Sequence, residues 1–330
     1  TEIYTLSLHD ALPISVLDGV ISKLSPSKVE YVRGCAIRDT TVNEIAEVVE
    51  AASRSEVIIA VVGGSSARDF KTSYQETGAA IADEKSISDM ECGEGFDRAT
   101  LTLLGKQQDL LNALKATGKP LIVVYIEGRP LDKVWASEYA DALLTASYPG
   151  QEGGYAIADV LFGDYNPAGR LPVSVPRSVG QIPVYYNKKA PCNHDYVEQA
   201  ASPLYTFGYG LSYTTFEYSD LQVIRKSPCY FEVSFKVKNT GSYDGEEVAQ
   251  LYLRDEYASV VQPLRQLKCF ERFFLKRGEE KEIFFTLTEK DLSIIDRNMK
   301  RVVETGDFRI MIGASSDDIR LTKDISVESL

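Results

Sequence analysis

A ten-residue stretch, residues 89–98, holds the densest set of side chains in this sequence that could do chemistry. It contains four carboxylates and one arginine, and a glycine stands on each side of Glu94. Glycines at these positions allow the backbone to turn sharply and to project the side chain between them. Two carboxyl groups that flank a scissile bond, one of them protonated, can hydrolyse a glycoside. A solvated acidic loop without chemistry is the alternative interpretation.

The elements around this stretch predict where it lies. Continuous apolar runs predict buried strands at residues 57–62, 121–126 and 142–146, and helical periodicity appears at residues 43–52, 104–116 and 150–162. Strands that alternate with helices are typical of an open, doubly wound α/β sheet. The long aperiodic interval between Val62 and Leu104 leaves the carboxyl end of a buried strand, where such sheets bind ligands. We therefore expect a site there.

The pattern changes near Phe216, where period-two alternation replaces the helical periodicity. Alternating apolar residues predict strands at residues 230–237, 248–253, 283–287 and 308–312, with glycine-containing turns between them. Short strands in this arrangement predict a β-sandwich. We expect an α/β domain over residues 16–184, a connector rich in Tyr, Pro and Gly over residues 185–215, and the sandwich over residues 216–330.

Composition excludes several classes of protein. The formal net charge of -12 disfavours a nucleic-acid partner, because an acidic chain repels phosphate backbones. No apolar run has the length of a transmembrane helix. Five scattered cysteines without a CxxC pair, together with only two histidines, argue against a zinc site, a disulfide scaffold or a histidine triad, and we expect free thiols.

Residues 1–15 look foreign to the fold. They lack the charged start and long apolar core of a signal peptide. The run YTLSLHDALPI resembles the in-frame translation of a common sequencing-adaptor oligonucleotide. We interpret residues 1–15 as an adaptor artefact and expect the natural start and any export signal to lie upstream. A genuine N-terminal helix is the alternative.

Five segments resemble glycoside hydrolase family 3. GEGFDRATLTLLGKQQDLL, residues 93–111, is similar to the acid/base loop of that family. Similar stretches continue in the family's order, with TGKPLIVVYIEGRP, YPGQEGGYAIADVLFGDYNPAGRLPVSVP and PLYTFGYGLSYTTF. VKNTGSYDGEEVAQLYL, residues 237–253, resembles the family's fibronectin type III-like domain. The resemblance extends over residues 16–330.

This resemblance implies a three-part retaining enzyme: a (β/α)-barrel with an aspartate nucleophile, an α/β sandwich domain with the acid/base, and a fibronectin type III-like domain. The barrel is absent from this chain, so we expect the chain alone to be inactive. The acid/base maps onto Glu94, with Glu91 in reserve because the loop is easily misaligned. Asp97 and Arg98 are expected to form a structural pair. Arg68 and Asp69 are candidates for binding sugar hydroxyls.

The function implied is that of an exo-acting β-glucosidase that removes terminal non-reducing β-D-glucosyl residues from oligosaccharides. A β-xylosidase of the same family and a non-catalytic carbohydrate-binding module are the alternatives. A nucleotide-binding protein is a weaker one, because no GxGxxG or GxxxxGK[ST] follows Gly63-Gly64. No cofactor or metal is expected, and the partners are an oligosaccharide and the missing barrel. We expect a periplasmic or extracellular bacterial protein.

Overall fold

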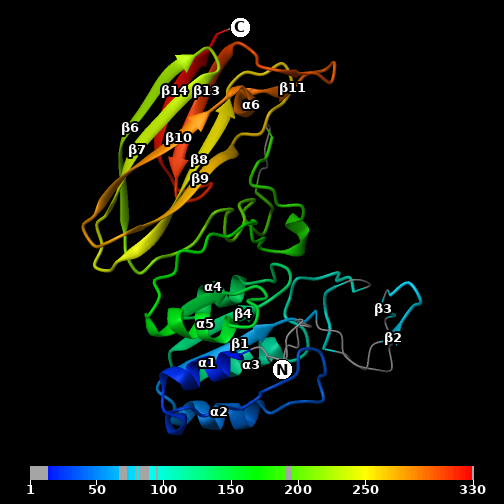
Figure 1. Ribbon diagram of the computed structural model, residues 1–330. Coiled ribbons are helices and arrows are strands. Elements are labelled where there is room, and N and C mark those ends of the chain that lie inside the picture. Colours follow the sequence, from blue (N-terminus) through cyan, green and yellow to red (C-terminus); the bar gives the residue numbers. More distant parts are fainter. Residues whose placement is uncertain are drawn as a thin grey trace. The chain divides into compact units, whose positions relative to one another are not determined.

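The computed structural model of the chain describes residues 14–66, 73–78, 80–81, 89–93, 96–189 and 195–328 (Figure 1). The chain divides into two compact units. The first unit comprises Thr1–Tyr165 and Pro176–Ile182, and the second comprises Asn166–Val175 and Pro183–Leu330. Residues 166–175 thus pack with the second unit, although they fall inside the range predicted for the α/β domain.

A parallel sheet with strand order β1-β4-β5 forms the centre of the first unit. Its strands are β1 (Ile58–Gly63), β4 (Leu121–Ile126) and β5 (Ala142–Thr145). The central strand β4 is apolar throughout because both of its faces are covered. Its alternate side chains enter two separate hydrophobic clusters, one on each face.

Helices cover both faces of this sheet, as expected for a doubly wound fold. One cluster contains residues of α2 (Ile45–Arg54), α3 (Gln107–Ala116) and α4 (Val134–Tyr139). The other contains residues of α1 (Val16–Lys23) and α5 (Gly153–Phe162). The predicted α/β class is therefore confirmed, whereas α1 and α4 were not foreseen.

Helices α1 and α5 approach each other at two glycines. A Cβ atom on Gly19 would lie 2.0 Å from the carbonyl oxygen of Gly154. A larger residue at position 19 would therefore push the two helices apart. Ser15 caps α1 in a reciprocal arrangement with Asp18. Ser15 belongs to the stretch interpreted as an artefact, and in the structure it is an integral part of the helix start.

The remaining short elements of this unit are η1 (Pro26–Lys28), β2 (Ser73–Tyr74), β3 (Ala80–Ile81) and η2 (Val179–Gln181).

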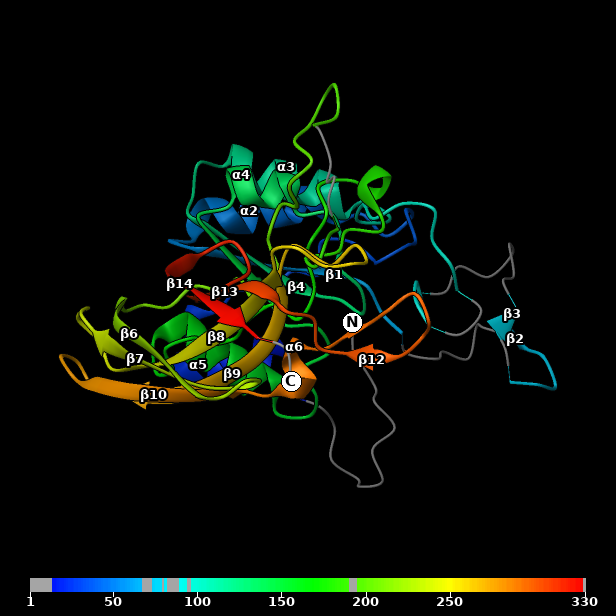
Figure 2. The same ribbon diagram turned by 90° about the horizontal axis from the view of Figure 1, so that it is seen from above.

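The second unit is a sandwich of two antiparallel sheets, seen from two sides in Figures 1 and 2. One sheet has the order β10-β7-β6 and consists of β6 (Phe216–Ser227), β7 (Tyr230–Asn239) and β10 (Glu280–Leu287). The other has the order β14-β13-β8-β9 and consists of β8 (Gly245–Asp255), β9 (Gln266–Leu275), β13 (Gly306–Gly313) and β14 (Ile319–Val327). Helix α6 (Glu289–Leu292) and the small pair β11 (Ile294–Ile295) and β12 (Arg301–Val302) complete it.

The sandwich core follows the predicted alternation. Phe231, Val233, Phe235 and Val237 of β7 are all buried, and they meet alternate residues of β8, β10 and β13 in a single cluster. Because successive side chains on a strand point to opposite faces, the residues between them face outward. The predicted β-sandwich is confirmed.

Candidate active site

The carboxyl ends of β1 and β4 lie side by side, and two glycines allow the chain to leave β1 there. Gly63 has φ of 137°, and a Cβ atom on it would lie 1.9 Å from the carbonyl oxygen of Ile126. Gln107, at the start of α3, binds both the N–H and the carbonyl of Gly63, at 2.8 and 2.9 Å. The Gly64 N–H donates to Ile126 at 2.9 Å. Both glycine donors are thus used within the protein, which contradicts a phosphate-binding role.

Residues 89–93 return to this edge and continue the sheet beyond β1. Met90 forms a parallel bridge with Ser65, whose carbonyl accepts hydrogen bonds from the N–H groups of Glu91 at 2.9 Å and Cys92 at 3.4 Å. Arg38 donates to the carbonyl of Met90 at 3.0 Å. Met90, Glu91 and Cys92 are all buried. The acid-rich segment therefore begins with buried, hydrogen-bonded residues at the predicted edge of the sheet.

Glu91 is paired inside the protein rather than presented to solvent. Its carboxylate Oε2 lies 2.7 Å from Nη1 of Arg98, and the two side chains are only 1% and 6% exposed. Its other oxygen, Oε1, has no hydrogen-bond partner among the described residues. The predicted Asp97–Arg98 pair is wrong, because Arg98 turns inward to Glu91 while Asp97 is exposed. Arg98 also donates to the carbonyl of Thr102.

Cys92 contacts the loop that follows β5. Its sulfur lies 2.9 Å from the hydroxyl of Tyr148. Burial raises the pKa of the Cys92 thiol and that of the Tyr148 phenol. Both groups are therefore neutral near pH 7, and Cys92 is not a thiolate nucleophile. Gly128 makes this contact possible, since a Cβ atom there would lie 2.8 Å from the sulfur and from the Tyr148 ring.

The loop after β4 is fixed by a second buried ion pair. Lys133 lies 2.6 Å from Glu127, with 1% and 4% of the two side chains exposed. Burial lowers the pKa of Lys133, an effect that the charge of Glu127 opposes. Glu127 also accepts the Leu131 N–H at 2.9 Å. Within this loop Arg129 donates to the carbonyl of Phe96 at 3.4 Å, so the loops that follow β1 and β4 are connected.

Three of the predicted site residues, Glu94, Arg68 and Asp69, lie outside the described residues. The described residues on either side of Glu94 converge, since the Phe96 N–H donates to the Gly93 carbonyl at 3.1 Å and Gly93 has φ of 121°. The structure places Glu91 beside this point, but in an internal ion pair.

Sequence reasoning missed several residues that support this edge. Glu127 and Arg129 could have been found, because they directly follow a buried strand and thus lie at the same edge as Gly63. Tyr148 follows the third strand in the same way. Nothing in the sequence marks Gln107, whose amide ties the start of α3 to β1.

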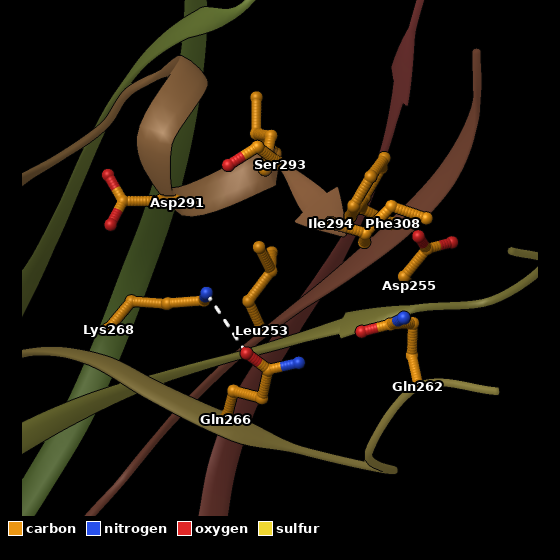
Figure 3. Close-up of a pocket in the computed structure, with 10 residues that line it drawn as sticks. Leu253, Asp255, Gln262, Gln266, Lys268, Asp291, Ser293, Ile294 and Phe308 are labelled. Atoms are coloured by element: carbon orange, nitrogen blue, oxygen red, sulfur yellow. Dashed lines mark hydrogen bonds between the residues drawn. The ribbon is translucent and has the colours of Figure 1, made fainter. Parts of the chain in front are cut away.

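A polar hollow in the second unit could be mistaken for the site (Figure 3). Its lining residues come from β8, β9, the loop between them, β13 and the stretch around α6: Leu253, Asp255, Gln262, Gln266, Lys268, Asp291, Leu292, Ser293, Ile294 and Phe308. Asp291 is engaged in capping α6 through Thr288, and Lys268 binds Gln266 at 3.1 Å. Burial lowers the pKa of Lys268 and raises that of Asp255. Asp255 accepts the Tyr257 N–H at 3.2 Å through Oδ1, whereas its Oδ2 has no hydrogen-bond partner among the described residues. We interpret the hollow as structural, because Asp291 and Lys268 bond to neighbouring groups of the protein.

The described part of the chain shows neither a metal-binding cluster nor a membrane-spanning helix. Among the described residues, no three His, Cys, Asp or Glu side chains gather so that they could hold a metal ion. None of the helices in that part of the chain is long and apolar enough to cross a membrane. The described cysteines, Cys35, Cys92, Cys229 and Cys269, are free thiols, as predicted.

Two family models match the chain. Residues 4–213 match the model of the glycosyl hydrolase family 3 C-terminal domain, and residues 247–316 match that of a fibronectin type III-like domain. The chain belongs to glycoside hydrolase family 3. The resemblance seen in the five sequence segments is thereby confirmed.

Named relatives of this family 3 chain include both glucosidases and xylosidases. A β-xylosidase of Formosa agariphila is 40% identical over 93% of the chain and 41% of its own length. A periplasmic β-glucosidase of Salmonella typhimurium is 43% identical over 84% of the chain and 35% of its own length. The chain therefore spans about two fifths of these curated relatives.

Solved structures agree with the fold. A β-glucosidase from Erythrobacter marinus superimposes on 95% of the family 3 chain with a TM-score of 0.82 and 36% identity, and the match covers 43% of that protein. A β-glucosidase from Listeria innocua in complex with glucose matches 92% of the chain, and 39% of its own, with a TM-score of 0.75 and 30% identity. These two β-glucosidases thus share the doubly wound domain and the β-sandwich of this chain.

Proposed function

We propose that this chain supplies the acid/base half of a retaining, exo-acting β-glycosidase, with Glu94 as the catalytic residue. The observation that carries the proposal is the position of the family's GEGFDR motif, which follows a segment bonded to the carboxyl end of β1. Glu94 would protonate the glycosidic oxygen and then deprotonate the water that attacks the glycosyl-enzyme. Glu91 is a poor candidate, because a proton donor must come within hydrogen-bond reach of its substrate and Glu91 is 1% exposed.

The nucleophile would come from the (β/α)-barrel that the family resemblance implies, upstream of this chain. Because hydrolysis with retention needs both carboxyl groups, the isolated chain should not cleave glycosides. The reaction needs only the two carboxyl groups and water, so we propose no cofactor. By analogy with the relative named as periplasmic, we propose a periplasmic or extracellular location.

Glucose is the sugar that we propose for the non-reducing end, and xylose is the second candidate. The β-xylosidase of Formosa agariphila, 40% identical to the chain, is the observation in favour of xylose. The two sugars differ by one hydroxymethyl group, and we propose that most of the groups that distinguish them belong to the barrel. Arg68 and Asp69 follow Ser65-Ser66 at the end of β1, and we propose that they bind sugar hydroxyls. An unchanged KM and kcat in Arg68→Ala would contradict that role.

The test compares the isolated chain with the complete enzyme, meaning this chain joined to its barrel. Both are assayed with 4-nitrophenyl β-glucoside and 4-nitrophenyl β-xyloside, and the anomer released first is followed by NMR. We expect no turnover by the chain alone, and release of the β-anomer by the complete enzyme. Turnover by the isolated chain above a buffer blank would contradict the division of carboxyl groups, and release of the α-anomer would contradict retention.

A further inference from the structure

We infer that the buried Glu91–Arg98 ion pair is a positioning device, which fixes the two ends of the segment that contains Glu94. The inference rests on the proposed function of Glu94 and deepens it. Glu91 and Arg98 would act through Glu94 and would not touch the substrate. Glu91 thereby has a role that differs from that of Glu94.

The entry side of the segment is fixed by backbone bonds. Ser65 accepts hydrogen bonds from Glu91 and Cys92, and Arg38 holds the carbonyl of Met90. The Cys92 sulfur adds its 2.9 Å contact with Tyr148 from the loop after β5. The chain thus enters the turn from a buried, parallel extension of β1.

The exit side is fixed by two arginines. Arg129 reaches the Phe96 carbonyl from the loop after β4, and Arg98 donates to the carbonyl of Thr102. The Phe96 N–H closes back on Gly93 at 3.1 Å. The loop after β4 therefore contributes a contact to the exit side of the turn.

The ion pair connects the two sides. Glu91 lies three residues before Glu94 and Arg98 lies four residues after it, and their side chains meet at 2.7 Å. Because the ends of the segment are held together, the few residues between them can reach only a limited region. A catalytic carboxyl needs this restriction, since a misplacement of about 1 Å can lower the rate by about 100-fold.

Gly64 completes the device. A Cβ atom on Gly64 would lie 2.0 Å from Oε1 of Glu91, so the carboxylate is packed directly against the backbone that leaves β1. One carboxylate oxygen of Glu91 is bonded to Arg98 and the other is packed against Gly64, so the Glu91 carboxylate is not accessible to a substrate. Its charge serves to orient the guanidinium of Arg98.

The experiment separates positioning of the acid from general destabilisation by varying the leaving group. In the complete enzyme, kcat/KM of Glu91→Gln is measured with an alkyl β-glucoside, which needs protonation of its leaving group, and with 2,4-dinitrophenyl β-glucoside, which does not. We expect kcat/KM to fall about tenfold or more for the alkyl glucoside and less than about threefold for the dinitrophenyl glucoside. Azide should not restore the rate, because the Glu94 carboxylate remains in place.

Two controls make the result decisive. Glu247→Gln breaks a similar ion pair with Arg170 in the other unit, in which the two atoms lie 2.7 Å apart and the Glu247 side chain is 2% exposed, and it should affect both substrates alike. If Glu91→Gln does not fold, Arg98→Lys, which keeps the charge but loses the second donor, is measured with the same two substrates. Equal losses on both substrates would overturn the inference, and rescue of Glu91→Gln by azide would make Glu91 the acid/base. A wild type that cleaves neither glucoside would instead refute the proposed function.

Discussion

The Glu91 carboxylate lies 2.7 Å from the Arg98 guanidinium, and both side chains are almost completely buried. Removing one member of such a pair leaves the other charge buried and unpaired, which costs about 3–5 kcal/mol. We therefore expect Glu91→Ala to lower the stability of the first unit by this amount. Urea unfolding followed by fluorescence of Trp135, the single tryptophan, reports on that unit. The matched control is Glu30→Ala, which breaks the exposed Arg54–Glu30 pair and should change the midpoint little.

Gly64→Ala should destabilise the same unit by a different route. The new Cβ atom would lie 2.0 Å from the Glu91 carboxylate, which is too buried to move freely. Overpacking of this kind costs about 1–3 kcal/mol. Gly180→Ala is the control, because its Cβ atom would come no closer than 3.6 Å to a neighbouring atom. Equal urea midpoints for the two variants would show that Glu91 does not pack against Gly64.

Alkaline pH should destabilise the first unit through Cys92 and Tyr148. Burial raises the pKa of both groups in the folded protein, so the unfolded chain loses these protons first. Their contribution to stability is complete below the ordinary pKa of 9.0 for the thiol and 10.0 for the phenol, and it is lost as the pH rises above those values. Tyr148→Phe should make the decline of Tm above pH 10.0 shallower. Tyr155→Phe, which changes an exposed tyrosine, should leave the slope unchanged.

Residues 166–175 should be required for the stability of the sandwich. Arg170 pairs with the buried Glu247 of β8 at 2.7 Å, and the same carboxylate accepts the Tyr218 hydroxyl at 3.1 Å. Arg170→Met would leave Glu247 buried without its cation, at a cost of about 3–5 kcal/mol. Calorimetry should show a lower transition temperature for the second unit only. Arg272→Met is the control. It removes the partner of Glu246, which neighbours Glu247 on β8, and should have little effect because the Arg272 side chain is exposed.

The sequence was sufficient for the elements whose patterns are local. Residues 121–126 are apolar throughout and form β4 with those bounds, and Phe231 to Val237 alternate as a half-buried strand must. The turn from β1 was also foreseen, because Gly63-Gly64 ends an apolar run. These features follow from chain neighbours alone, which is why a single sequence reveals them.

Features that depend on contacts between distant residues were not foreseen. Arg98 and Asp97 are neighbours, and nothing in their spacing indicates that Arg98 would reach Glu91 across the turn. The connection of Arg170 to Glu247 joins residues 77 positions apart. The sequence therefore predicted that residues 166–175 belong to the α/β domain, although a buried ion pair attaches them to the sandwich.

The proposal that Glu94 is the acid/base is tested most directly in the complete enzyme with Glu94→Ala and an aryl β-glucoside, with and without azide. Loss of a general acid/base lowers the rate by about 10²- to 10⁴-fold. We expect such a loss, together with partial rescue by azide and formation of a β-glucosyl azide. Glu56→Ala, which removes an exposed carboxylate just before β1, is the control and should retain normal activity. Near-normal hydrolysis by Glu94→Ala, without a glucosyl azide product, would contradict the assignment.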